Sequence, residues 1–129
     1  MTNKIRTAIY CRVAREDDFA MELQERKLLR FAEQESFEVA LVFKDNGATG
    51  RDFARAGYMQ LRDAAQRGEV DVVIVSSLDR IARNHTQIVA QLDWFEKRNV
   101  TVISAVPGEN NIKLFVPGIA QLVASIHAR

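Results

Sequence analysis

Four apolar runs alternate along the chain with segments in which apolar residues recur at helical spacing. The runs cover residues 7–13, 37–43, 70–75 and 100–104 and are rich in β-branched and aromatic residues, which is typical of strands. The third run is almost entirely apolar, as expected of a strand buried on both faces. Strands that alternate with helices predict an α/β fold, a three-layer sandwich around a mostly parallel central sheet.

The segments between these runs predict three helices. Their apolar rows are Met21, Leu28, Phe31 and Ala32 with Glu35 beside them, then Tyr58, Leu61 and Ala65, then Ile88, Leu92 and Phe95. Arg67-Gly68 follows the second helix as a typical glycine stop. Residues 44–51 contain two glycines and are predicted to form a loop.

The last segment repeats apolar residues in a heptad-like row. Phe115, Ile119, Leu122 and Ile126 follow one another at steps of four, three and four, which predicts a helix beginning near Phe115. This helix could pack on its own sheet, or it could continue past residue 129 and meet a second copy or a following domain. We favour the second interpretation, in which residues 1–129 are one domain that ends within a longer helix.

Length and charge narrow the class of protein. A chain of 129 residues supports one domain with its own core, and it contains no run long enough to span a membrane. The single cysteine, Cys11, excludes a disulfide framework and favours a reducing, cytoplasmic location. Lysines and arginines (18) nearly balance acidic residues (17), so binding of DNA by bulk charge is not expected. Thirteen of the basic residues are arginines, whose planar group suits phosphate.

Arginines follow two of the predicted strands. Arg12 lies at the end of the first strand, and Arg80 and Arg83 follow the third. Ligands of parallel sheets bind beyond the carboxyl ends of strands, so these arginines would converge with Asp79 if the two strands are neighbours. Such a cluster could clamp a phosphoryl group. The alternative is that Asp79 only pairs with Arg80 or Arg83 at the surface.

Other polar residues carry weaker signals. Gln24 falls on the inward face of the first helix, where its amide needs hydrogen-bond partners. It could donate to an anion or orient another side chain. The alternative is that it simply lies at the edge of the apolar row. Cys11 lies inside a strand and is expected to be buried. His85 and His127 lack companion ligands, and no glycine-rich phosphate loop occurs, so neither a metal nor a nucleotide cofactor is expected.

Four motifs together resemble the serine recombinases, the family of resolvases, invertases and large serine integrases. Tyr10-Cys11-Arg12-Val13-Ala14 is similar to the family's Tyr-x-Arg-Val/Leu-Ser, and Leu78-Asp79-Arg80-Ile81-Ala82-Arg83 is similar to its Leu-x-Arg-x-x-Arg. Gln24 corresponds to a glutamine on the family's first helix, and Ala54-Arg55-Ala56-Gly57-Tyr58 resembles Asp-Arg-Pro-Gly-Phe. The resemblance runs from about Ile5 to the end of the chain.

The resemblance implies a resolvase-like catalytic domain in which a serine attacks a DNA phosphodiester and forms a 5′-phosphoserine link, without metal or ATP. Arg12, Arg55, Arg80 and Arg83 would then bind the scissile phosphate. Asp79 would act in acid-base chemistry or orient an arginine, and Gln24 would organise the site. In the full-length protein the C-terminal helix would join subunits into a dimer and a synaptic tetramer, and would lead to a DNA-binding region absent from this chain.

One residue departs from the family pattern. Ala14 occupies the position of the nucleophilic serine, and its side chain has no attacking oxygen, so this form is expected to be inactive. Ser76 and Ser77 do not occupy the family's nucleophile position. Either a serine was replaced deliberately or the chain is a naturally inactive homologue that acts as an assembly or regulatory module; the intact arginine set favours replacement. A flavodoxin-like phosphate-binding or nucleotide-binding protein is a third alternative.

Overall fold

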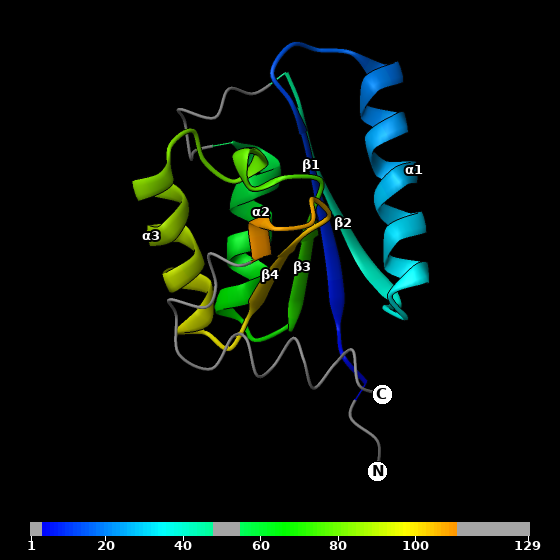
Figure 1. The fold of residues 1–129 in the computed structure, drawn as a ribbon. Coiled ribbons are helices and arrows are strands. Elements are labelled where there is room, and N and C mark those ends of the chain that lie inside the picture. Colours follow the sequence, from blue (N-terminus) through cyan, green and yellow to red (C-terminus); the bar gives the residue numbers. More distant parts are fainter. Residues whose placement is uncertain (1–3, 48–54, 111–129) are drawn as a thin grey trace.

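The computed structural model describes residues 4–47 and 55–110, which form a four-stranded sheet with helices on both faces (Figure 1). The strands are β1 (Thr7–Val13), β2 (Val39–Asn46), β3 (Val72–Val75) and β4 (Thr101–Ser104). They lie in the order β2-β1-β3-β4, and all three pairings are parallel. The predicted parallel α/β sheet is therefore confirmed.

The helices form the two outer layers. Helix α1 (Asp18–Gln34) covers one face of the sheet, and helices α2 (Ala56–Gln66) and α3 (His85–Glu96) cover the other (Figure 1). Alternate residues of β1 point to opposite faces: Ile9 and Cys11 belong to the core under α1, whereas Ala8 and Tyr10 belong to the core under α2 and α3. This arrangement confirms the three-layer sandwich.

The helix ends follow local chemistry. Asp17 accepts a hydrogen bond from the Ala20 backbone N–H (3.0 Å) and caps α1, and Asn84 caps α3 in the same way through Gln87 N–H (2.9 Å). Gly68 follows α2 with φ of +71°, the left-handed conformation that the glycine stop predicts.

The second strand begins and ends later than predicted. The apolar run suggested residues 37–43, but β2 runs to Asn46 because its ladder with β1 continues to the pair Val13↔Asn46. Asp45 and Asn46 are thus strand residues rather than loop residues. Phe37 precedes the strand and is buried beneath the end of α1, where its N–H donates to the Ala32 carbonyl (2.8 Å).

The third strand is shorter than its apolar run. It begins at Val72; the preceding Asp71 accepts hydrogen bonds on its carboxylate from the backbone N–H and the side chain of Arg6. Glu35, predicted on the inner row of the first helix, instead caps its C-terminus. The helix predicted to begin near Phe115 lies outside the described residues.

Candidate functional site

The candidate site lies at the carboxyl edge of the sheet, between β1 and β3. These strands are neighbours, and the chain leaves them in opposite directions, since β2 lies beyond β1 and β4 lies beyond β3. Such a switch point is the usual ligand position in open parallel sheets. Arg12 is the sixth residue of β1, and the short 3-10 helix η1 (Leu78–Arg80) follows β3. The predicted juxtaposition of these two segments is confirmed.

Arg12 binds the backbone of η1. The side chain is almost completely buried, and its Nε donates to the Arg80 carbonyl (3.1 Å) while its Nη2 donates to the Asp79 carbonyl (2.7 Å). Burial lowers the pKa of Arg12, and the positive charge of Arg55 lowers it further. Arg12 therefore connects the end of β1 to the loop that carries Asp79 and Arg80.

Arg55 reaches the same segment from the start of α2. It precedes α2, is 5% exposed, and donates through Nη1 to the Arg80 carbonyl (3.3 Å) and through Nη2 to the Ile81 carbonyl (2.9 Å). Its guanidinium carbon lies 4.6 Å from the centroid of the Tyr58 ring and 5.7 Å from that of Tyr10, distances typical of cation–π contacts. Two positively charged groups thus meet at η1.

Asp45 fixes the start of α2 and hence the position of Arg55. Its buried carboxylate accepts from the backbone N–H groups of Gly57 and Tyr58 (both 2.8 Å) and from the Tyr10 hydroxyl (2.7 Å). The two N–H groups belong to the first turn of α2, which has no other intrahelical acceptor for them. A Cβ atom on Gly57 would lie 2.3 Å from the Lys44 carbonyl oxygen, so this contact between α2 and β2 requires glycine.

The side chain of Gln24 makes two hydrogen bonds to the backbone of Arg12. Its Oε1 accepts from the Arg12 N–H (2.9 Å), and its Nε2 donates to the Arg12 carbonyl (3.1 Å). The inward orientation predicted for this half-buried side chain is confirmed, and its partners are those of a side chain that orients a neighbour.

Arg12 reaches the segment of Asp79, Arg80 and Arg83 through its backbone carbonyls, and the charges of Asp79 and Arg80 also act on the Arg12 guanidinium. Asp79 is exposed and accepts a hydrogen bond from the Ser77 hydroxyl. The Nε atom of Arg80 lies 4.0 Å from Asp79 Oδ1 and 3.2 Å from Ser76 Oγ. Arg83 is exposed beyond η1. The alternative in which Asp79 pairs with Arg80 at the surface therefore agrees with the observed geometry.

Position 14 lies in an exposed loop at this edge of the sheet. Two residues after Arg12, Ala14 begins the connection between β1 and α1. The end of β2 holds this connection in place: Asn46 accepts from the Asp17 N–H (2.8 Å) and donates to the Asp18 carboxylate (2.9 Å), and Gly47 N–H donates to the Val13 carbonyl (2.9 Å).

Comparison with known proteins decides the family. The family described as "Resolvase, N terminal domain" matches residues 7–128. The chain belongs to this family. No curated protein matches the chain in sequence.

Solved serine recombinases share the fold of this resolvase domain. The catalytic domain of ISC1926 TnpA, an IS607-like serine recombinase, is 25% identical with a TM-score of 0.74, covering 95% of this chain and 85% of that chain. The catalytic domain of TP901-1 integrase is 24% identical with a TM-score of 0.72, covering 95% and 92%. A resolvase family recombinase from Streptococcus pneumoniae is 23% identical with a TM-score of 0.73, covering 97% and 89%. The resolvase domain is a serine recombinase catalytic domain.

Cys11 and His85 are two further described residues of the resolvase domain with nucleophilic or metal-binding side chains. Cys11 is fully buried, and burial raises the pKa of its thiol to about 12, which confirms packing rather than nucleophilic chemistry. His85 is exposed at the first turn of α3, and His127 lies outside the described residues. Residues 4–47 and 55–110 contain no cluster of three metal-ligating side chains, and none of their helices is long and apolar enough to cross a membrane.

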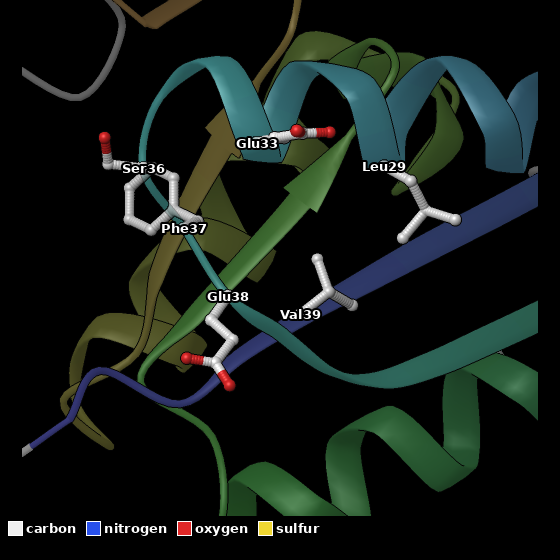
Figure 2. A pocket seen from close by; sticks show the side chains of 6 residues that line it. All are labelled: Leu29, Glu33, Ser36, Phe37, Glu38 and Val39. Carbon is white, nitrogen blue, oxygen red and sulfur yellow. The ribbon is translucent and has the colours of Figure 1, made fainter.

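Two shallow hollows of the resolvase domain lie away from the arginines. One, of about 470 Å³, lies at the amino end of β2, and Figure 2 shows the six residues around it: Leu29, Glu33, Ser36, Phe37, Glu38 and Val39. The other, of about 370 Å³, lies between α1 and β2 and is lined by Asp18, Glu22 and Glu25 among others. Carboxylates in both hollows make them unsuited to a phosphodiester.

No role was predicted for Asp45 or Tyr10 from the sequence. Asp45 was predicted to lie in a loop, but β2 extends to Asn46 and brings the Asp45 carboxylate to the start of α2. Tyr10 belonged to a recognised motif, but its hydroxyl partner lies on a different strand. The sequence offered a signal only for the close approach of α2 to β2, namely Gly57, two residues after Arg55.

Proposed function

We propose that this serine recombinase catalytic domain positions a DNA phosphodiester at the carboxyl edge of its sheet for attack by residue 14, and that Ala14 makes the present form inactive. The observation that carries the proposal is the meeting of Arg12 and Arg55 at one carbonyl of η1, beside the loop that holds position 14. Arg80 and Arg83 lie on the same segment with more exposed side chains. Arg12, Arg55 and Arg80 would thus supply positive charge to a phosphate that enters at this edge of the sheet, with Arg83 beyond them.

With serine at position 14, the hydroxyl oxygen would attack phosphorus and lose its proton to a base, for which Asp79 is the candidate. The new serine oxygen–phosphorus bond would replace the bond to the 3′ oxygen, which leaves as a free 3′-hydroxyl after taking up a proton. The positive charges of the arginines would stabilise the extra negative charge on the phosphoryl oxygens in the transition state. Reversal of the same step would rejoin the strand.

Gln24 and Asp45 support this chemistry through their neighbours. Gln24 fixes the backbone of Arg12, two residues from the attacking position. Asp45 fixes the start of α2 and so the approach of Arg55. In this proposal the arginines supply the positive charge, so the reaction uses neither a metal nor a nucleotide.

DNA and further subunits are the proposed partners. The near balance of charge in this chain implies few phosphate contacts, and affinity for DNA grows with their number. We therefore expect weak DNA binding by residues 1–129, and assign tight binding to a region beyond them. The heptad-like row from Phe115 would join subunits as a dimer and, during strand exchange, as a tetramer.

The deciding experiment restores the nucleophile. Ala14→Ser in the full-length protein, given a DNA site selected from a random library by that protein, should yield a covalent phosphoserine-DNA adduct with a free 3′-hydroxyl. Ala14→Gly is the matched control, since it also changes the loop but supplies no oxygen. The proposal fails if the serine form binds its site and assembles, yet leaves the DNA intact.

A second function has one observation in its favour, Ala14 itself. A resolvase domain that naturally carries alanine there would serve as an assembly or regulatory module that pairs with active subunits. An alanine codon in the natural gene, together with no adduct from the serine form, would establish this alternative.

A further inference from the structure

We propose that Glu109 is a positioning residue of the candidate site: it fixes the first residue of η1 and thereby the carbonyls that receive Arg12 and Arg55. The inference rests on the proposed function for its catalytic consequence, but its structural part can be tested separately. Glu109 lies in the segment that follows β4, at the same edge of the sheet as the arginines.

One carboxylate oxygen of Glu109 joins the ends of two strands. Its Oε1 accepts from the Leu78 backbone N–H (2.9 Å) and from the Ser104 hydroxyl (2.6 Å). Leu78 begins η1, three residues after β3 ends at Val75, and Ser104 is the last residue of β4. The half-buried carboxylate therefore ties the arginine-bearing segment to the neighbouring strand.

The segment that carries Glu109 is itself firmly held. Asn110 accepts from the Ser104 N–H (2.9 Å) and donates to the Ser104 carbonyl (2.9 Å). The Ser104 hydroxyl, which donates to Glu109, also accepts from the Val106 N–H (3.1 Å). Because both sides of Glu109 are anchored on β4, its carboxylate can hold Leu78 in a fixed position.

The Glu109 carboxylate supplies a hydrogen-bond acceptor at the start of η1 that the neighbouring Ser77 side chain does not provide. Ser77 precedes η1 but makes no side-chain capping hydrogen bond, and its hydroxyl donates to Asp79 instead. The Leu78 N–H is one of the first N–H groups of η1, which have no acceptor within the helix, and Glu109 provides a charged one.

The arginine contacts lie one to three residues after the Glu109 contact along the chain. The Leu78 carbonyl accepts from Ile81 N–H (3.0 Å), and the carbonyls of Asp79, Arg80 and Ile81 accept from Arg12 and Arg55. A shift of Leu78 would move these carbonyls and the side chains of Asp79 and Arg80 together. Glu109 thus acts on the arginines through η1.

The structural part is tested with Glu109→Ala and Glu109→Gln in residues 1–129, by nuclear magnetic resonance. Glu33→Ala, an exposed position near the far end of α1, is the control. We expect Glu109→Ala to raise the hydrogen-exchange rate of the Leu78 amide about tenfold, as losing one hydrogen bond to a charged acceptor would. We also expect it to shift the Arg12 Nε–H resonance, while Glu109→Gln, which keeps an acceptor oxygen, changes both less.

A merely structural role predicts a different pattern. In that case Glu109→Ala would lower the melting temperature and leave the Arg12 Nε–H resonance where it is, which would overturn the proposal. Unchanged exchange at Leu78 would overturn it as well.

The catalytic consequence is tested in the full-length protein with Ala14→Ser. Adding Glu109→Ala should slow formation of the covalent DNA adduct about tenfold or more, and Glu109→Gln should recover most of the rate. An unchanged rate with Glu109→Ala contradicts the positioning role. If the serine form makes no adduct at all, the proposed function fails, and the resonance and exchange measurements still decide whether Glu109 holds the arginine-bearing segment.

Discussion

Arg12 and Arg55 donate to the same oxygen, the carbonyl of Arg80, at 3.1 and 3.3 Å. They come from different elements, one from the end of β1 and one from the start of α2. Two like charges are therefore held close together in a nearly buried setting, and the backbone dipoles of η1 are part of what offsets their repulsion.

Loss of Arg12 should cost stability that loss of Arg83 does not. Arg12→Ala removes two charge-assisted hydrogen bonds to η1 and leaves their buried carbonyls without that donor, so we expect the free energy of unfolding to fall by about 2–4 kcal/mol. Arg83→Ala changes an exposed side chain and should stay within about 0.5 kcal/mol of the parent. Urea denaturation measures both, and equal losses would contradict the asymmetry.

Gly57→Ala should lower the free energy of unfolding more than an ordinary glycine substitution does. The added Cβ would lie 2.3 Å from the Lys44 carbonyl, which belongs to a strand and cannot easily move. We expect a loss of about 3 kcal/mol or more in unfolding free energy. Gly68→Ala is the matched control: its site is open, and the left-handed φ of +71° costs only about 1–2 kcal/mol. A smaller loss at Gly57 than at Gly68 would show that α2 does not pack against β2 as described.

Stability should fall in alkaline solution. Burial raises the pKa of Cys11 from 9.0 to about 12, and it raises the pKa values of Tyr10 and Tyr58 above 10.0. The unfolded chain therefore releases these protons at lower pH than the folded chain. The contribution of these groups to the free energy of unfolding is fully present below pH 9.0. It is lost as the pH rises toward their pKa values in the folded chain, by about 1.4 kcal/mol per pH unit for each group.

Urea midpoints between about pH 8 and pH 11 measure this loss, since the midpoint follows the unfolding free energy at a constant slope. Cys11→Ala removes the group that titrates first, so the decline should then begin about one pH unit higher, where the tyrosines of the unfolded chain ionise. Stability that is flat or rising over this range would contradict the assignment.

Gln24 should contribute to stability through both the oxygen and the nitrogen of its side-chain amide. Gln24→Ala leaves the Arg12 N–H and carbonyl without these partners, and we expect a loss of about 1–2 kcal/mol in unfolding free energy. Gln24→Glu keeps the acceptor but loses the donor to the Arg12 carbonyl, so it should recover only part of that loss. Gln34→Ala, at an exposed position on the same helix, is the control. Full recovery by glutamate would mean that only the acceptor is used.

The sequence was most informative where structure follows from local pattern. The bounds of β1 were predicted to the residue, and the inward orientation of Gln24 followed from its spacing between Met21 and Leu28. The partners of Arg12 could not be predicted, because backbone carbonyls look alike in every residue and only the packing of η1 selects them. Asp45 was missed because its place in β2 depends on pairing with β1. Glu109 contacts an N–H 31 residues earlier in the chain, and no motif records such a contact.

Because Cys11 is buried, a cysteine introduced at position 14 could be labelled selectively. The chain has one cysteine, and its thiol is fully buried with a pKa of about 12. With Ala14→Cys, the new thiol would lie in the exposed loop after β1 and would be the only one open to reagents in the folded domain. A fluorophore or spin label attached there would report on the approach of DNA from the place where attack is proposed to begin.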